Sequence, residues 1–166
     1  MNDASTSTNS ALVRQLAQIL LAKKLIMASA ESCTGGWIAQ SLTALAGSSE
    51  WFDTGFVTYS NEAKQRLLAV PSSCFEVDGP GAVSEETVLA MTQGAIDNSR
   101  ANVAVAVSGI AGPDGGSKDK PVGTVWIAWQ WQDQALARCF QFIGDREAVR
   151  LAAVTAGLQG LIELID

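Results

Sequence analysis

The stretch "LIMASAESCTGGW", residues 25–37, joins an apolar segment to a turn rich in polar residues and glycine. The first half is free of charge, as in a strand buried inside a sheet. The second half brings a carboxylate, two hydroxyls and a thiol together before a glycine pair, at Glu31, Ser32, Cys33 and Thr34. In open α/β sheets, ligands bind where buried strands end and loops lead into helices. We therefore expect a strand, a functional turn and a helix in this order.

Periodicity along the chain predicts the other elements around this unit. Residues 1–8 are rich in Ser and Thr without apolar periodicity, so we expect a loose tail there and a single domain over residues 9–166. The expected elements are a helix at 10–24, a strand at 25–30, a helix at 37–46, a strand at 55–60, a helix at 61–70, a loop at 71–83, a helix at 84–98, a strand at 102–109, a hairpin of strands at 124–131 and 135–143, and a helix capped by Asp145. This order predicts an α/β fold with three layers, α/β/α, in which the middle layer is a mixed, mainly parallel five-stranded sheet.

Composition limits the classes of function. The chain has 166 residues, of which 48% are hydrophobic, enough to bury a core without disulfides or a structural metal. Three cysteines without CxxC spacing, and a start that lacks a basic and then apolar leader, predict a cytoplasmic protein with reduced thiols. We see no apolar run that approaches the ~18 residues of a membrane span, and expect no membrane partner. A net charge of -6 without a basic stripe also argues against nucleic acid as a partner.

The chain contains no histidine. This excludes the Ser-His-Asp arrangement and removes the usual general base and most zinc or iron sites. We expect no metal site and no cofactor. Any catalysis must use Lys, Tyr, Cys, Ser and carboxylates.

The turn after the first strand has two interpretations. A hydroxyl at Ser32 beside the free backbone N–H groups of Thr34, Gly35 and Gly36 suits a nucleophile with a phosphate or oxyanion cradle. Alternatively, Thr34 or Ser32 only caps the helix, and the glycines only permit a tight turn. The motif alone leaves both open.

A lysine at the start of the next helix supplies a candidate base. Lys64 follows Asn61, an expected helix cap, and both the helix dipole and partial burial there favour the neutral amine. The alternative is a solvated surface lysine. Tyr59 ends the preceding strand, where its phenol could relay a proton or orient the lysine, unless it is an ordinary core aromatic.

Cys33 is a second candidate nucleophile. Glu31, Cys33 and Lys64 provide the residue types of a Glu-Lys-Cys set, which cleaves amides without histidine. On an extended segment Glu31 and Cys33 face one side and Ser32 the other. Only one of the two nucleophiles can therefore face Lys64.

A glycine-rich loop follows the fully apolar strand at 102–109. The segment "SGIAGPDGG" begins with Ser108, and its Gly109 and Gly112 allow close approach of a ligand to the backbone. Arg146, at the start of the last helix, is a candidate cation for a phosphate. The alternatives are a plain surface loop and a surface ion pair with Asp145 or Glu147.

Six motifs in order carry a resemblance to a known family: "AESCTGG", "GFVTYSNEAK", "GAVS", "AVSGIAGPDGG", "KPVGTVW" and "GDREAVR". Together they resemble the nicotinamide-nucleotide amidohydrolases, a family that is also the C-terminal domain of competence- and damage-inducible protein A. The resemblance covers the chain from about Leu12 to the last helix, in the stand-alone form without a preceding domain.

The resemblance implies deamidation of nicotinamide mononucleotide to nicotinate mononucleotide and ammonia, in a protein commonly found as a homodimer. By matched motif it implies a catalytic Ser32 and Lys64 with an assisting Tyr59, and so favours Ser32 over Cys33. The expected substrate-binding residues are Glu31, Thr34, Gly35, Gly36, Asn61, Ser108, Gly109, Gly112 and Arg146. The competing hypotheses are an amidase that uses Cys33 and a non-catalytic module that binds nucleotides for regulation.

Overall fold

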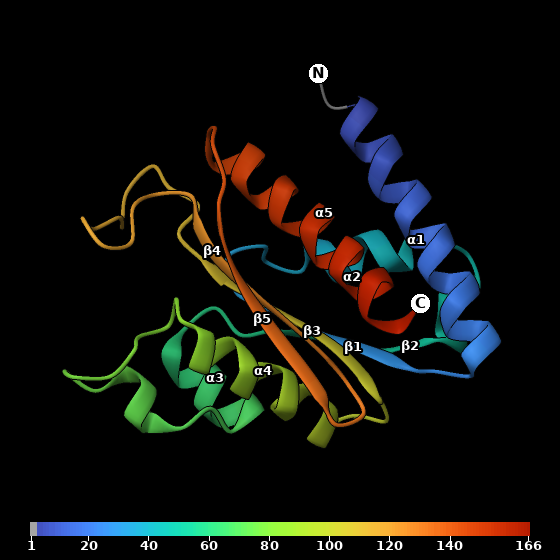
Figure 1. The fold of residues 1–166 in the computed structure, drawn as a ribbon, viewed down its shortest axis with the longest axis horizontal. Coiled ribbons are helices and arrows are strands. Elements are labelled where there is room, and N and C mark those ends of the chain that lie inside the picture. The colour runs from blue at the N-terminus through green and yellow to red at the C-terminus, as the bar shows by residue number, and fades with distance from the viewer. Residues whose placement is uncertain (1–2) are drawn as a thin grey trace.

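A computed structural model describes residues 3–166 and contains one mixed five-stranded sheet (Figure 1). Its strand order is β2-β1-β3-β4-β5. β1 pairs in parallel with β2 and with the central strand β3, whereas β4 is antiparallel to both β3 and β5. The strands are β1 (Met27–Glu31), β2 (Phe52–Val57), β3 (Val103–Gly109), β4 (Thr124–Trp131) and β5 (Gln134–Gln141). The predicted α/β class with a mixed sheet is confirmed, but the sheet is not mainly parallel in its pairing, because the hairpin of β4 and β5 makes two of the four strand pairings antiparallel.

Helices cover both faces of the sheet. In Figure 1, α1, α2 and α5 lie on one face, and α3 and α4 on the other. The helices are α1 (Asp3–Lys23), α2 (Trp37–Thr43), α3 (Asn61–Leu68), α4 (Glu85–Asp97) and α5 (Arg146–Ile165), with single 3-10 turns at Ser48–Glu50 and Ser72–Phe75. This arrangement confirms the three predicted layers.

The first helix is longer than the sequence indicates. It begins at Asp3, so residues 3–8, expected as a loose tail, continue α1, and residues 1 and 2 lie outside the described residues. Once the apolar face from Val13 to Leu20 has fixed a helix against the core, each further turn costs little, because propagation adds one hydrogen bond for each residue that is ordered. Polar composition alone therefore mispredicted this segment.

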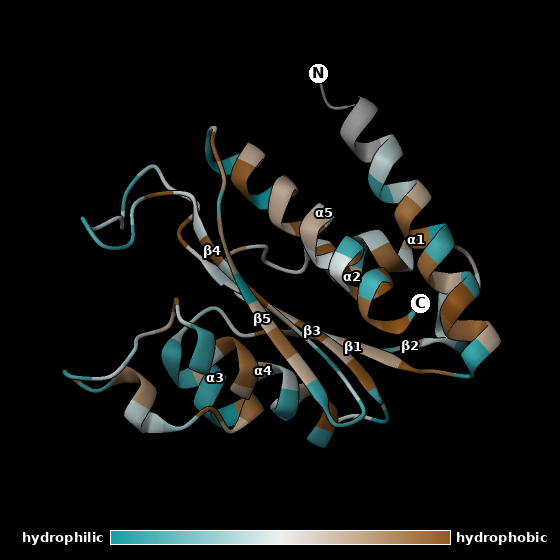
Figure 2. Ribbon diagram, viewed as in Figure 1, coloured by the Kyte–Doolittle hydropathy of each residue, from teal (hydrophilic) through white to brown (hydrophobic). Residues whose placement is uncertain are grey.

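Alternation along the strands gives the two faces of the sheet different side chains. Large residues such as Met27, Val105 and Ile127 face α1, α2 and α5, whereas alanines such as Ala30 and Ala106 face α3 and α4. Apolar colouring follows the strands between the two helical layers (Figure 2). The inner strands β1, β3 and β4 are thus largely buried, whereas the edge strand β5 is mostly exposed.

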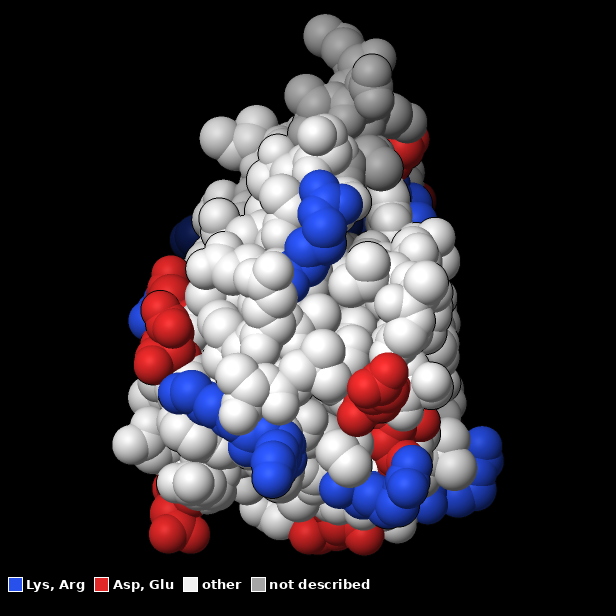
Figure 3. All heavy atoms as spheres, turned by 90° about the vertical axis from the view of Figure 1, so that its right-hand side faces the viewer, with Lys and Arg blue, Asp and Glu red and all other residues white. Residues whose placement is uncertain are grey.

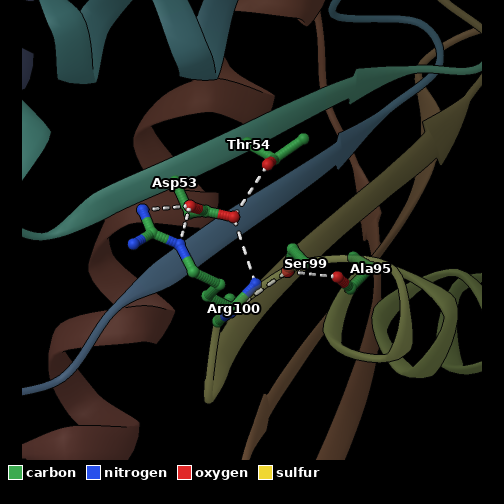
Figure 4. Close-up of polar contacts among 6 residues, drawn as sticks. Asp53, Thr54, Ala95, Ser99 and Arg100 are labelled. Atoms are coloured by element: carbon green, nitrogen blue, oxygen red, sulfur yellow. Dashed lines mark hydrogen bonds and ion pairs between the residues drawn. The ribbon is translucent and has the colours of Figure 1, made fainter.

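An ion pair fixes the start of the edge strand β2. Asp53 accepts hydrogen bonds from the backbone N–H of Arg100 at 3.1 Å and from its Nε at 2.8 Å (Figure 4). These bonds hold the pKa of the Asp53 carboxyl below its usual range. The contact joins β2 to the loop between α4 and β3, at the end of the sheet opposite to the catalytic candidates.

Among the described residues, α5 is long and apolar enough, by length and composition only, to cross a membrane. The sequence interpretation overlooked it because charged residues interrupt its apolar run. In this fold α5 packs against α1, β3 and β4, and residues such as Val149, Ala153 and Leu158 are fully buried there. The helix is part of the core of this domain.

Candidate active site

The end of β1 and the start of α3 bring a hydroxyl and an amine together. Ser32 is the first residue after β1, and Lys64 lies in the first turn of α3. The Lys64 Nζ lies 2.9 Å from the Ser32 Oγ, and also donates to the carbonyl oxygen of Thr58 at 2.7 Å. The carboxyl ends of the parallel neighbours β1 and β2 meet at one edge, so two motifs 32 residues apart come into contact. The predicted meeting of Ser32 and Lys64 is observed.

Lys64 is buried, with only 1% of its surface exposed. Burial lowers the pKa of its amine to about 8, because desolvation penalises the charged form. Within residues 3–166, no carboxylate forms an ion pair with Lys64. At pH 7 about a tenth of this lysine is therefore neutral and able to accept a proton, far more than for a lysine with an ordinary pKa.

The helix cap before Lys64 is Ser60 and not Asn61. The Ser60 hydroxyl accepts from the N–H of Ala63 at 3.0 Å, and its backbone is extended, as an N-cap requires. Serine and asparagine cap helices about equally well, so the sequence could not separate these neighbours. Asn61 is the first residue of α3, and its side chain is among those that line the cavity described below.

Glu31 does not face the cavity, contrary to its expected role in substrate binding. Its side chain is fully buried, and its carboxylate accepts from the N–H groups of Gly36 at 3.0 Å, Ile38 at 3.0 Å and Ala39 at 2.9 Å. The carboxylate therefore caps α2, whose N-terminus attracts negative charge. It is also committed away from Lys64, which removes a member of the proposed Glu-Lys-Cys set.

The N–H groups of Gly35 and Gly36 are already engaged and so are not free to contact a substrate, whereas the expected substrate contact of Thr34 stays a prediction. The Gly35 N–H donates to the Ser32 carbonyl at 3.0 Å, and the Gly36 N–H donates to Glu31. None of the three residues lines the cavity beside Ser32. Gly35 and Gly36 have φ values of 63° and 95°, which glycine adopts without strain. The two residues therefore permit the tight turn, as the alternative interpretation of this motif proposed.

A cavity of about 230 Å³ opens beside Ser32 and Lys64. It is lined by Ser32, Cys33, Tyr59, Asn61, Lys64, Ala82, Val83, Ser108, Gly109, Ala111 and Arg146. Seven of these residues are predicted site residues, whereas Ala82, Val83 and Ala111 were not foreseen. A larger hollow along residues 73–80 shares no lining residue with it, so volume alone does not identify the site.

Arg146 lies at the mouth of this cavity. Its Nη2 donates to the Tyr59 hydroxyl at 2.9 Å, and its Nη1 donates to the Gly112 carbonyl at 2.7 Å. Tyr59 is 63% exposed and is therefore no core aromatic, and the group that orients Lys64 is the Thr58 carbonyl. Gly112 does not line the cavity, and its carbonyl accepts from Arg146, so its expected contact with the substrate stays a prediction.

Two side chains hold the loop that precedes α4, which forms part of the cavity wall. Ser108 Oγ donates to the Ala82 carbonyl at 2.7 Å, and Lys120 Nζ donates to the Pro80 carbonyl at 2.7 Å. This is how Ala82 and Val83 come to line the site. In Figure 1 the loop before α4 and the loop between β3 and β4, which carries Lys120, lie at the same end of the sheet as the start of α5.

The thiol of Cys33 is poorly suited to be a nucleophile here. Cys33 is 5% exposed and packs in the core under α1, α2 and α5. Burial raises the pKa of its thiol to about 11, so the reactive thiolate is scarce at neutral pH. The Cys33 alternative is therefore disfavoured on chemical grounds.

Arg150 lies on α5 and hydrogen-bonds to the turn that follows Ser32, a role that the sequence interpretation missed. Its Nε donates to the Cys33 carbonyl at 3.0 Å and its Nη2 to the Thr34 carbonyl at 2.9 Å. Its guanidinium also lies 5.2 Å from the ring centroid of Trp37. The signal was its spacing, four residues after Arg146, which places both arginines on one side of the helix.

The capping role of Glu31 leads to a stability prediction. Glu31→Gln removes the charge and replaces one acceptor oxygen by a donor that faces backbone N–H groups, so we expect the free energy of unfolding to fall by about 1–3 kcal/mol. Chemical denaturation, with Glu62→Gln on the exposed side of α3 as control, measures the difference. Equal stability of the two variants would show that the Glu31 carboxylate is not the cap.

Comparisons with known proteins find relatives that match most of the chain. The CinA C-terminal domain pattern matches residues 9–165. A Pseudomonas putida protein named nicotinamide-nucleotide amidohydrolase PncC is 56% identical over 135 residues, which cover 81% of this chain and 83% of that protein. The protein of the same name from Escherichia coli K12 is 50% identical over 151 residues, 90% of each chain. The crystal structure of the competence/damage inducible protein CihA from Agrobacterium tumefaciens superposes with a TM-score of 0.92 at 43% identity, over 96% of both chains.

Proposed function

Because the chain belongs to the CinA C-terminal domain family, we propose that it hydrolyses the carboxamide of nicotinamide mononucleotide, giving nicotinate mononucleotide and ammonia. It is an amidohydrolase that acts on a small nucleotide. The observation that carries this proposal is the contact of 2.9 Å between the Lys64 amine and the Ser32 hydroxyl in a cavity. A serine beside a desolvated lysine is a nucleophile beside its base, which is what amide hydrolysis without histidine requires.

The first half of the reaction forms an ester. Neutral Lys64 accepts the proton of Ser32 while Oγ attacks the carboxamide carbon, and the carbonyl oxygen becomes an oxyanion. The C–N bond then breaks, the proton on Lys64 passes to the nitrogen, and ammonia leaves a nicotinoyl ester on Ser32. Backbone N–H groups at Cys33 and Thr34 hold the oxyanion, since those of Gly35 and Gly36 are bonded within the turn.

The second half releases the acid. Lys64, again neutral, takes a proton from water, and the resulting hydroxide attacks the ester carbon. The tetrahedral intermediate collapses with cleavage of the bond to Ser32 Oγ, which recovers its proton from Lys64. The Thr58 carbonyl holds the amine in place through both halves. No step requires a metal or an organic cofactor.

The remaining lining residues hold the nucleotide. Arg146, at the mouth, supplies the cation for the phosphate, and its bond to Tyr59 keeps the phenol beside the reacting amide, where it assists proton transfer to the leaving nitrogen. Asn61, Ser108 and Gly109 contact the rest of the substrate from the cavity wall. Residues 9–166 form one domain with this single function.

The surroundings of the enzyme follow from its surface and composition. On the face in Figure 3, basic side chains form separate groups with acidic ones between them, a pattern that does not suit the phosphate backbone of nucleic acid. From composition and charge we infer a cytoplasmic protein with neither a nucleic-acid nor a membrane partner, and from the family resemblance alone a homodimer or higher homo-oligomer.

The state of Lys64 makes the reaction depend on pH. Because Lys64 must be neutral and its pKa is about 8, kcat/KM for nicotinamide mononucleotide should rise about fivefold between pH 7 and 8 and level off above pH 9. Initial rates above about pH 7, where the substrate phosphate no longer titrates, measure this limb. A flat profile between neutral pH and 9 would remove Lys64 as the base.

Product analysis tests the proposal as a whole. Purified protein, incubated with nicotinamide mononucleotide and no added metal, should release nicotinate mononucleotide and ammonia in equal amounts. Nucleotide binding without release of either product would refute the hydrolase and favour a regulatory binding module. Nicotinamide riboside and free nicotinamide, assayed in parallel, measure how much the phosphate contributes.

A further inference from the structure

The turn that carries Ser32 is held from two sides by opposite charges. On one side the buried carboxylate of Glu31 accepts from backbone N–H groups at the start of α2. On the other side the guanidinium of Arg150 donates to the carbonyl oxygens of Cys33 and Thr34, the two residues that follow the nucleophile. A single side chain from α5 thus contacts two consecutive peptide groups, of which the Thr34 carbonyl also accepts from the Trp37 N–H at 3.2 Å.

Because the peptide bond is planar, the contacts of Arg150 with two carbonyls also set the direction of the N–H groups of Thr34 and Gly35. In a trans peptide the N–H points opposite to the carbonyl of the preceding residue. With the Cys33 carbonyl turned to Arg150, the Thr34 N–H is directed away from the guanidinium, and it finds no protein acceptor in the described chain. With the Thr34 carbonyl also turned to Arg150, the Gly35 N–H is directed to its bond with the Ser32 carbonyl.

We propose that Arg150 is a positioning residue, which sets the place of the Ser32 hydroxyl and the direction of the Thr34 N–H through these two carbonyls. It is absent from the lining of the cavity, so it acts on the turn and not on the substrate. This inference rests on the proposed hydrolase function. It assigns to Arg150 an effect on kcat with little effect on KM.

The geometry requires arginine. The planar fork of a guanidinium can donate to both carbonyls while its face lies over Trp37 at the start of α2. A lysine amine at this position can neither stack in this way nor span both oxygens in one plane. Arg150→Lys should therefore retain only part of the activity.

Chemical rescue tests the proposal. Arg150→Ala leaves a space where the guanidinium was, whereas Arg150→Met fills most of it with an apolar chain. We expect kcat of both variants to fall about 10- to 100-fold, with KM within about threefold of the wild type. Free guanidinium, at concentrations far below those that unfold proteins, should restore kcat of the Ala variant in a saturable way but not that of the Met variant.

A matched control and a second readout complete the test. Arg138 also lies over a tryptophan, Trp129, and among residues 3–166 its ion pair is with the exposed Glu163, so Arg138→Ala should keep the wild-type kcat. The rate at which a small sulfonyl fluoride modifies Ser32 reports the nucleophile without using the nucleotide. It should fall in Arg150→Ala and Arg150→Met, and recover with guanidinium in the Ala variant only.

The outcomes separate this inference from the proposed function. A loss confined to KM, or a lower melting temperature with unchanged kcat and unchanged labelling of Ser32, would overturn the positioning role. If the wild type releases no ammonia from nicotinamide mononucleotide, the proposed function fails. The labelling rates of the Arg150 variants then still decide whether Arg150 positions Ser32.

Discussion

Ser32→Ala should lower the turnover of nicotinamide mononucleotide by about 10³-fold or more, because the variant has no oxygen to form the ester. Lys64 keeps its contact with the Thr58 carbonyl in this variant, and a methyl group fits where the hydroxyl was. The fold and nucleotide binding should therefore remain. Ammonia release measures the loss, and titration calorimetry with the nucleotide measures binding.

Cys33→Ala is the control for this variant. Since burial raises the pKa of the Cys33 thiol to about 11, we expect the Cys33 variant to retain most of the wild-type kcat, with at most a small loss of stability from the missing sulfur. The opposite pattern, in which Ser32→Ala turns over normally and Cys33→Ala does not, would assign the nucleophile to Cys33.

Lys64→Met should lower kcat by about 10²- to 10⁴-fold, the range of a lost general base. Its effect on the free energy of unfolding should stay within about 2 kcal/mol, because the variant loses two hydrogen bonds but no longer buries an amine that is partly charged. The pH limb near 8 should disappear with the amine. Rates and chemical denaturation of the same preparation measure both effects.

Lys64→Arg distinguishes a role of Lys64 as proton acceptor from a role as positive charge. Arginine stays protonated at every accessible pH, so it keeps a cation near Ser32 but cannot accept its proton. We expect this variant to be as inactive as Lys64→Met. An active Lys64→Arg would mean that the site needs a positive charge there and that the general-base mechanism is wrong.

The contact between Ser32 and Lys64 was predictable because it depends on chain order. A strand that ends in "ESCTGG" and a neighbouring strand that leads into "YSNEAK" place Ser32 and Lys64 at one edge of any sheet in which the two strands are parallel neighbours. Burial of Lys64 follows from its place in the first turn of α3, between the sheet and the loop. Local patterns were therefore sufficient for the reacting groups.

The supporting groups were not predictable in this way. Glu31 has the composition of a site carboxylate, and only the close approach of α2 shows that its oxygens are used by backbone N–H groups. Arg150 reaches the Thr34 carbonyl across 116 residues of sequence, and no local pattern identifies such a partner. Ala82 and Val83 carry no chemistry of their own, so only the fold reveals them.

The central claim is that Ser32 carries the acyl group during hydrolysis. Its most direct test is the mass of the protein after acid quenching during turnover of nicotinamide mononucleotide, with fragmentation to locate the adduct and ammonia measured in the same samples. The account predicts a nicotinoyl nucleotide ester on Ser32 in the wild type, and neither adduct nor ammonia from Ser32→Ala. An adduct on Cys33, or undiminished ammonia release by Ser32→Ala, would contradict it.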